Sequence, residues 1–186
     1  VSERCPRTAL KETWKATLDS FGGQHRRQLA KRCRQLQERF AVELEVCRRR
    51  EDLDGDVEAF MAMHQHRWTS VGRRGVYADP PVAAFQREVA RAFFDRGWLY
   101  LAFLRLDGAR VAALCGFKHG GALAYYLNGV AEAGEARRFS PGLVQHCLCM
   151  EDLIGQGVRV YDFLRGTERY KYECGAVDVP NWTVQA

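Results

Sequence analysis

The sequence has no apolar run long enough to cross a membrane and no secretory signal pattern. It also has no internal repeat and no low-complexity segment, so repeat architectures are excluded. The remaining composition, 47% hydrophobic and 27% charged over 186 residues, is that of an ordinary globular domain. We therefore expect one domain or lobe with its own core. Because the chain begins at Val1 and not at Met, we expect a processed or trimmed fragment of a longer protein.

The seven cysteines form no C-x-x-C pair, and their number is odd. Cys147 and Cys149 are two residues apart in an expected helix, so their side chains point to different sides. This pattern predicts neither a zinc site nor a disulfide framework. We therefore expect no bound metal and a reducing, cytoplasmic location.

The positive charge is concentrated in one segment, residues 23–40. This segment contains six Arg or Lys residues and one Glu, a balance equal to the whole net charge of +5. Two interpretations are possible for these charges. They could form a surface that binds phosphates or nucleic acid, or they could simply be the solvated face of a helix. Apolar residues recur at helical spacing in the same segment: Leu29, Cys33, Leu36 and Phe40. Because this stripe indicates packing and no aromatic residues alternate with the arginines, we do not expect nucleic acid as a partner.

Hydrophobic spacing and turn residues predict the order of the elements. We expect helices over 10–21, 23–40, 57–71, 82–93 and 141–154, and strands over 41–48, 99–106, 111–118, 122–130 and 158–164. Residues 1–40 would form an N-terminal segment of two helices, the second of them basic, and residues 41–186 the main domain. The three strands over 99–130 form an antiparallel meander, and the helix after them should make a right-handed crossover to a parallel strand. The fold class is therefore α/β (α+β), with a mixed sheet.

Charged and aromatic residues gather just after the last expected strand, where open α/β folds often build their sites. Asp162 lies among apolar neighbours and could act as a base or orient Tyr170, Lys171 or His64. Glu168 is the alternative base. Lys171, expected on a loop with little contact to the core, could stabilise an oxyanion or bind a phosphate of the acceptor.

A second group of candidates shares one face of the helix over 57–71. His64, Arg67 and Trp68 are spaced i, i+3 and i+4, and together they could line an acceptor pocket. His64 is a third candidate base because the histidine pKa is close to neutral pH. His66 should point elsewhere, to the surface.

A third group precedes and begins the helix over 141–154. Ser140 followed by Pro141 is a typical helix start, and the free backbone N–H groups of a first turn suit a diphosphate. Arg137 and Arg138 come just before it and could pair with phosphates. We therefore assign cofactor binding to Arg137, Arg138, Ser140 and Gly142.

Three of these motifs together resemble a known family: His64-x-x-Arg67-Trp68, Ser140-Pro141-Gly142 and Asp162-Phe163-Leu164-x-Gly166-x-Glu168-x-Tyr170-Lys171. They are similar to the CelD-like acyltransferases of the GNAT superfamily, which are related to the Fem aminoacyltransferases. The resemblance implies the GNAT-like acyl-CoA N-acyltransferase fold, in which the two parallel strands diverge beside the acyl-CoA. It also implies substrate binding by Gly166 and Tyr170. Tyr125 and Tyr126 point to opposite faces of their strand, and we assign Tyr126 to the cleft.

The resemblance implies transfer of an acyl group from acetyl-CoA or another acyl-CoA to an amine or hydroxyl of a sugar, polysaccharide or envelope precursor. Two alternatives remain. One is a Fem-like transferase that takes its acyl group from aminoacyl-tRNA, and the other is a non-catalytic lobe that only binds a partner. Many relatives carry an additional N-terminal lobe, so such a lobe or a homodimer could complete the acceptor site.

Overall fold

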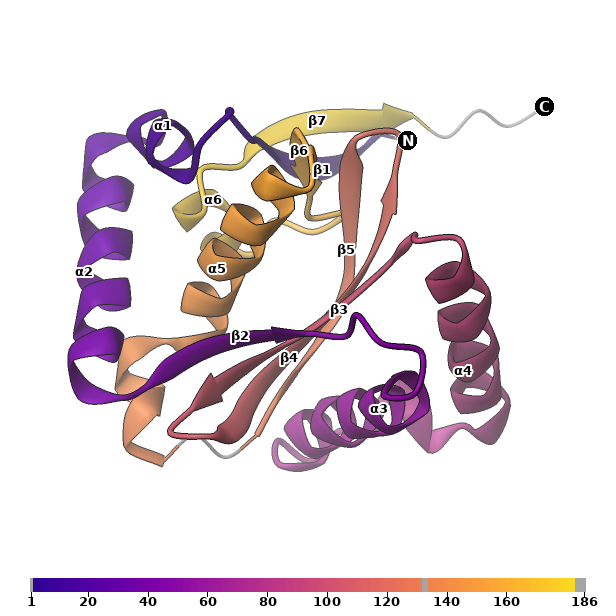
Figure 1. Cartoon of the computed structure of the whole chain (residues 1–186). Helices are drawn as coiled ribbons and strands as arrows, with labels where there is room; N and C mark the ends of the chain where they lie inside the picture. Colours follow the sequence, from indigo (N-terminus) through magenta and orange to yellow (C-terminus); the bar gives the residue numbers. More distant parts are fainter. Residues whose placement is uncertain (1, 132–133, 183–186) are drawn as a thin grey trace.

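The structure, a computed structural model, describes residues 2–131 and 134–182 of the chain. Figure 1 shows a single twisted sheet with helices on both of its faces. Its strands are β1 (Ser2–Ala9), β2 (Val42–Val46), β3 (Leu99–Leu106), β4 (Ala109–His119), β5 (Ala122–Val130), β6 (Val160–Asp162) and β7 (Val177–Trp182). The helices are α1 (Trp14–Asp19), α2 (Gly23–Arg39), α3 (Leu53–Thr69), α4 (Pro80–Asp95), α5 (Pro141–Gly155) and α6 (Arg169–Glu173), with short 3-10 turns η1 (Val76–Ala78) and η2 (Gly134–Phe139).

The strands form one mixed sheet in the order β2-β3-β4-β5-β6-β1-β7. The meander β3-β4-β5 is antiparallel, and β5 and β6 are parallel neighbours, as predicted. Their pairing covers three residues of each strand, from Ala122 opposite Val160 to Ala124 opposite Asp162. Beyond this point β5 continues to Val130 while β6 ends, so the ladder between the two strands stops at the end where we predicted them to diverge.

Both faces of the sheet are covered, which explains why β3 and β4 are apolar almost throughout. In β3 every residue except Arg105 is buried. Figure 1 shows α1, α2, α5 and α6 on one side of the sheet, and α3 and α4 on the other. One core cluster lies under the first group of helices and includes Leu10, Leu29 and Met150, and a second lies under α3 and α4. The stripe predicted on the basic helix is confirmed, because Leu29 and Leu36 are buried.

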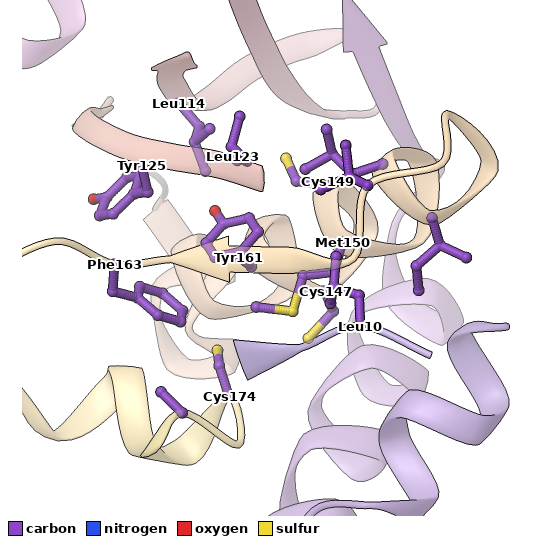
Figure 2. Close-up of a cluster of buried hydrophobic side chains, with 14 of the residues drawn as sticks. Leu10, Leu114, Leu123, Tyr125, Cys147, Cys149, Met150, Tyr161, Phe163 and Cys174 are labelled. Carbon is purple, nitrogen blue, oxygen red and sulfur yellow. The ribbon is translucent and has the colours of Figure 1, made fainter. Parts of the chain in front are cut away.

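Aromatic rings fill the region where β5 and β6 separate. Figure 2 shows Tyr125 of β5 near Tyr161 and Phe163, at and just after β6. The ring centroids of Tyr161 and Phe163 are 4.8 Å apart, and those of Tyr125 and Phe163 are 6.0 Å apart. These rings therefore pack against one another where the ladder between β5 and β6 ends.

Two strands were not predicted. Residues 1–40, expected to be helical, do contain α1 and α2, but Ser2–Ala9 is the strand β1, which pairs with both β6 and β7. The prediction for residues 2–9 was wrong because of Pro6. A proline within a run of residues argues against a strand, and at this position it suggested the start of a helix. The partners of β1 lie more than 150 residues away, so no local pattern signals the pairing. The predicted strand over 158–164 is shorter, ending at Asp162.

Candidate functional site

A cavity of about 750 Å³ opens beside β5, beyond the point where β6 leaves it. Its walls come from six elements. They are one turn of α2, the end of α3, the end of β5, the turn η2, the first turns of α5, and α6. The site is therefore placed by the separation of the parallel strands, as in other open α/β sheets.

The first turn of α5 forms one wall. Ser140 precedes it in a left-handed conformation with φ of 55°, and Pro141 takes the first helical position. The N–H groups of Leu143 and Val144 donate to the carbonyl of Ser140, and Pro141 has no N–H. The N–H of Gly142 is therefore the one in this turn that is left to bind a ligand. The space beside Gly142 is open, because nothing lies within 4 Å of where its Cβ would be. An anion can approach this backbone closely.

The cavity is lined by three arginines and only one carboxylate, that of Glu173. Arg32 of α2 pairs with Glu173 of α6 at 2.8 Å, and Arg67 of α3 donates to the side-chain oxygen of Asn128. The guanidinium of Arg137 makes no ion pair with the residues in 2–131 and 134–182. The cavity is therefore a positively charged pocket suited to an anionic ligand such as a phosphate.

The inner wall carries two neutral titratable groups, His146 of α5 and Tyr170 of α6. Their rings are stacked, with centroids 5.5 Å apart. Burial raises the pKa of Tyr170 to about 12 and lowers the pKa of His146 to about 3. Both side chains are therefore uncharged at neutral pH, and Tyr170 can give up a proton but cannot act as a base.

Five of the predicted site residues do meet at the cavity: Arg67, Arg137, Ser140, Gly142 and Tyr170. They come from the three separate groups that the sequence suggested. Their roles in binding or catalysis stay predictions.

His64 does not reach the cavity. It is buried, and its Nδ1 donates to the backbone carbonyl of Asn128 at 2.7 Å. Its Nε2 is buried without a hydrogen-bond partner in the described part of the chain. Burial lowers the pKa of His64, and its ring packs against Phe60 and Tyr77. In this structure His64 fastens α3 to β5, and it cannot serve as a base for a ligand in the cavity without rearrangement.

Asp162 also has a structural role in place of the expected contacts with Tyr170, Lys171 or His64. One of its carboxylate oxygens accepts from Arg7 of β1 at 2.7 Å, and the other accepts from the backbone N–H of Leu164 at 2.7 Å. Leu164 has a φ of 54°, a left-handed conformation that the Asp162 contact helps to hold. A role for Asp162 as base would require a break in both contacts.

Lys171 lies on α6 and is buried, contrary to the expectation of a loop lysine with little core contact. Its Nζ donates to the carbonyls of Arg165 and Gly166 and pairs with Glu168 at 2.9 Å. Gly166 has a φ of 109°, and a Cβ there would collide with the Glu168 carboxylate, so glycine is required. Burial acts to raise the pKa of Glu168, but the hydrogen bond from Lys171, a backbone hydrogen bond and the charge of Lys171 together outweigh it, so the pKa is lowered. Together these residues brace the turn that presents Tyr170.

The remaining predicted residues lie outside the cavity. Tyr126 is the extra residue of a β-bulge, since Cys115 pairs with Leu127 and Gly116 with Tyr125. The bulge turns Tyr126 to an exposed position near Phe117, so it is Tyr125 that contacts His146.

Arg138 and Trp68 are likewise outside. Arg138 pairs with Glu135 and lies over the ring of Phe139. Trp68 is half-buried, with the guanidinium groups of Arg67 and Arg73 near its ring.

Several cavity residues were missed or misplaced by the sequence prediction. His66 is exposed, as expected, yet it lines the cavity. The sequence predicts Arg32 only as part of a basic helix and assigns no role to His146. The sequence does hold a signal for His146, because Gln145 and His146 are polar residues inside the otherwise apolar run from Leu143 to Met150.

Replacement of Lys171 by Met should lower the free energy of unfolding by about 1–3 kcal/mol, because two carbonyls and a carboxylate lose their partner. Urea denaturation measures this change. Arg169→Met is the matched control in the same helix. Arg169 is exposed, and its ion pair with Glu173, which Arg32 also contacts, should be worth less than about 0.5 kcal/mol. Equal stability of the Lys171 variant and the wild type would show that the lysine does not brace the turn.

Within the described residues, no three His, Cys, Asp or Glu side chains are grouped as metal ligands. In the same part of the chain, no helix has both the length and the apolar character needed to cross a bilayer.

The fold is shared with two solved structures. The crystal structure of FemX superposes with a TM-score of 0.68 at 13% identity, covering 94% of this chain and 59% of that one. The C-terminal domain (DUF2156) of "Putative Lysylphosphatidylglycerol Synthetase" from Agrobacterium fabrum superposes with a TM-score of 0.62 at 12% identity, covering 97% of this chain and 59% of that one. At these identities the likeness concerns the fold alone. This chain spans 59% of the length of each of these two proteins.

No curated protein sequence matches the chain. A sequence profile of the family described as "Acetyltransferase (GNAT) domain" matches residues 23–172. Since this match spans well over half of the 186 residues and agrees with the mixed sheet and its parallel strand pair, the chain belongs to the GNAT acetyltransferase domain family.

Proposed function

We propose that the chain transfers an acyl group from acetyl-CoA or another acyl-CoA to an amine or hydroxyl of an acceptor. The observation that carries the proposal is the cavity where β5 and β6 diverge, with its three arginines and the first turn of α5 on the walls. The diphosphate of CoA matches the charge of this wall. The thioester would then lie toward the neutral inner wall formed by His146 and Tyr170. No metal takes part in the proposed reaction.

The acceptor class rests on the motif resemblance to CelD-like acyltransferases. We propose a sugar, polysaccharide or envelope precursor, and a cytoplasmic location, where the seven free thiols would stay reduced. An additional lobe or a second copy of the chain could complete the acceptor side. The chain covers 59% of the FemX chain, so part of FemX has no counterpart in this chain, and we propose that an additional lobe could correspond to it.

A Fem-like reaction with aminoacyl-tRNA is the second candidate, favoured by the fold similarity to FemX. The basic helix α2 gives it little support. Arg26, Arg32, Arg34 and Arg39 already form ion pairs with Asp19, Glu173, Glu38 and Glu135. A surface on which four of six cations are paired in this way is a weaker site for a phosphate backbone.

Acetyl-CoA should bind and raise the melting temperature, and at about 100 times its dissociation constant it should add about 2.7 kcal/mol of stability. Arg137→Ala should weaken binding about tenfold, because it removes a cation from the cavity wall. Arg138→Ala is the matched control next to it, outside the cavity and paired with Glu135. Isothermal titration calorimetry measures both. Equal losses in the two variants would contradict this binding mode, and stabilisation by tRNA without any by acetyl-CoA would favour the Fem-like reaction.

A further inference from the structure

His146 is held in the inner wall by a partner that lies outside the cavity. Its side chain is 3% exposed, and its Nδ1 is 2.7 Å from the hydroxyl of Tyr161 on β6. One ring face stacks on Tyr170, and the ring lies perpendicular to that of Tyr125, with centroids 4.9 Å apart. The ring therefore has a single well-defined orientation.

The other ring nitrogen, Nε2, faces the cavity. Within residues 2–131 and 134–182, Nε2 has no hydrogen-bond partner, yet it is not among the side-chain nitrogens and oxygens sealed from solvent. His146 lines the cavity, whereas Tyr161, the partner of Nδ1, does not. Nε2 is therefore the polar atom that His146 offers to a ligand.

The Tyr161 hydroxyl determines which nitrogen carries the proton. Tyr161 is completely buried, and burial raises its pKa, so the hydroxyl keeps its hydrogen. Within the described chain, its one hydrogen-bond partner is Nδ1 of His146. A buried O–H that did not donate would cost about 1–3 kcal/mol, so the hydroxyl donates and Nδ1 accepts. The proton of the neutral imidazole then sits on Nε2.

His146 also resists a second proton. Burial, the nearby Lys171 and the nearby Arg67 lower its pKa, in that order of importance. At neutral pH the side chain is therefore an uncharged donor that points into the cavity.

We propose that the Nε2–H of His146 is a catalytic hydrogen-bond donor to the thioester carbonyl oxygen, and that Tyr161 is the positioning residue that fixes its tautomer. This role rests on the proposed acyl transfer. Attack by an acceptor nitrogen or oxygen on the carbonyl carbon forms a new bond and moves one electron pair onto the carbonyl oxygen. Nε2–H stabilises that oxyanion. When the pair returns, the C–S bond breaks, CoA leaves as a thiolate, and the proton lost by the acceptor passes through water to the thiolate.

The tautomer is tested without any substrate. Proton–nitrogen correlation NMR of the uniformly ¹⁵N-labelled protein, with His146→Gln for assignment, should show a protonated Nε2 and an unprotonated Nδ1 between pH 6 and pH 8. Tyr161→Phe removes the donor to Nδ1, and the Nδ1–H tautomer should then appear. A wild-type His146 with its proton on Nδ1 would overturn the proposal, because Nε2 would then be an acceptor.

The catalytic role is tested with acetyl-CoA alone, by thiol release to water as the acceptor. His146→Leu should lower kcat by about 10²–10³-fold with little change in KM. His146→Gln keeps a neutral N–H donor at a similar reach but cannot act as a base, so it should stay within about tenfold of the wild type. A Gln variant as slow as the Leu variant would overturn the donor role.

A failure of the proposed function and a failure of the proposed role of His146 give different results. If the wild type neither binds acetyl-CoA in calorimetry nor releases thiol from it, the proposed function fails, and the role of His146 in it fails too. If the wild type does both and His146→Leu releases thiol at the wild-type rate, only the role of His146 is refuted. Melting temperatures of all three variants identify any loss of folding.

Discussion

Gly129→Ala should lower the free energy of unfolding by about 2–3 kcal/mol, one of the largest effects of a single methyl group in this protein. A Cβ at this position of β5 would lie 2.6 Å from the backbone nitrogen of His64 and 2.8 Å from the backbone carbon of Met63. Backbone atoms of a helix cannot rotate away as a side chain can, so α3 would have to move off the sheet. Urea denaturation at an unchanged m value measures the loss.

Gly155→Ala is the control for that change. Gly155 is the last residue of α5, and nothing lies within 4 Å of where its Cβ would be. Alanine there should leave stability unchanged or raise it by up to about 1 kcal/mol. Because Asn128, next to Gly129, holds both His64 and Arg67, the Gly129 variant should also bind acetyl-CoA more weakly. A Gly129 variant as stable as the wild type would mean that α3 does not pack this closely.

The unfolding free energy should fall by about 2 kcal/mol between pH 6.5 and pH 5 because of His146. The pKa of His146 is about 3 in the folded protein, compared with an ordinary value of 6.5. Between these values the unfolded chain binds one proton more than the folded chain. Stability therefore rises with pH across this window, by about 1.4 kcal/mol per pH unit for one group.

His64 adds a loss of the same sign, because burial lowers its pKa as well. The contribution of His146 is isolated by urea denaturation of the wild type and His146→Gln at several pH values. The curve of the variant should be flatter by about 2 kcal/mol over the window. Measurement stops at pH 5, because carboxylates such as Glu45, whose pKa the contact with Arg110 lowers, begin to contribute below it. Parallel curves would show that His146 takes up a proton in the folded protein.

The central part of the fold was predictable because its signals are local. Asp107 and Gly108, both at positive φ, form the turn between β3 and β4 that the sequence indicates. Ser140 and Pro141 begin α5 where expected. The order strand, helix, strand then requires a parallel pair, and the divergence of β5 and β6 followed from the family resemblance.

The candidate site was only partly predictable, because burial decides what each polar residue does. The run from Asp162 to Lys171 has the composition of a catalytic cluster. In the structure, however, Asp162 binds Arg7 and a backbone N–H of its own turn, and Lys171 binds two backbone carbonyls and Glu168. Sequence spacing placed His64 and Arg67 on one helix face, and both do meet Asn128, but only Arg67 reaches the cavity. The importance of His146 depends on a contact with Tyr161 that only the crossover of α5 creates.

The position of β1 has a consequence for how the chain assembles. β1 is the first strand in sequence, yet its neighbours are β6 and β7, so that Arg7 is paired with both Asp162 and Val177. During synthesis, at about 5–20 residues per second, the meander β3-β4-β5 is complete well before β1 has a partner. Contacts of such long sequence separation form late and slow the folding rate. We therefore expect the carboxylate of Asp162 to receive Arg7 only when β1 pairs, and the turn that carries Tyr170 to be fixed late in folding.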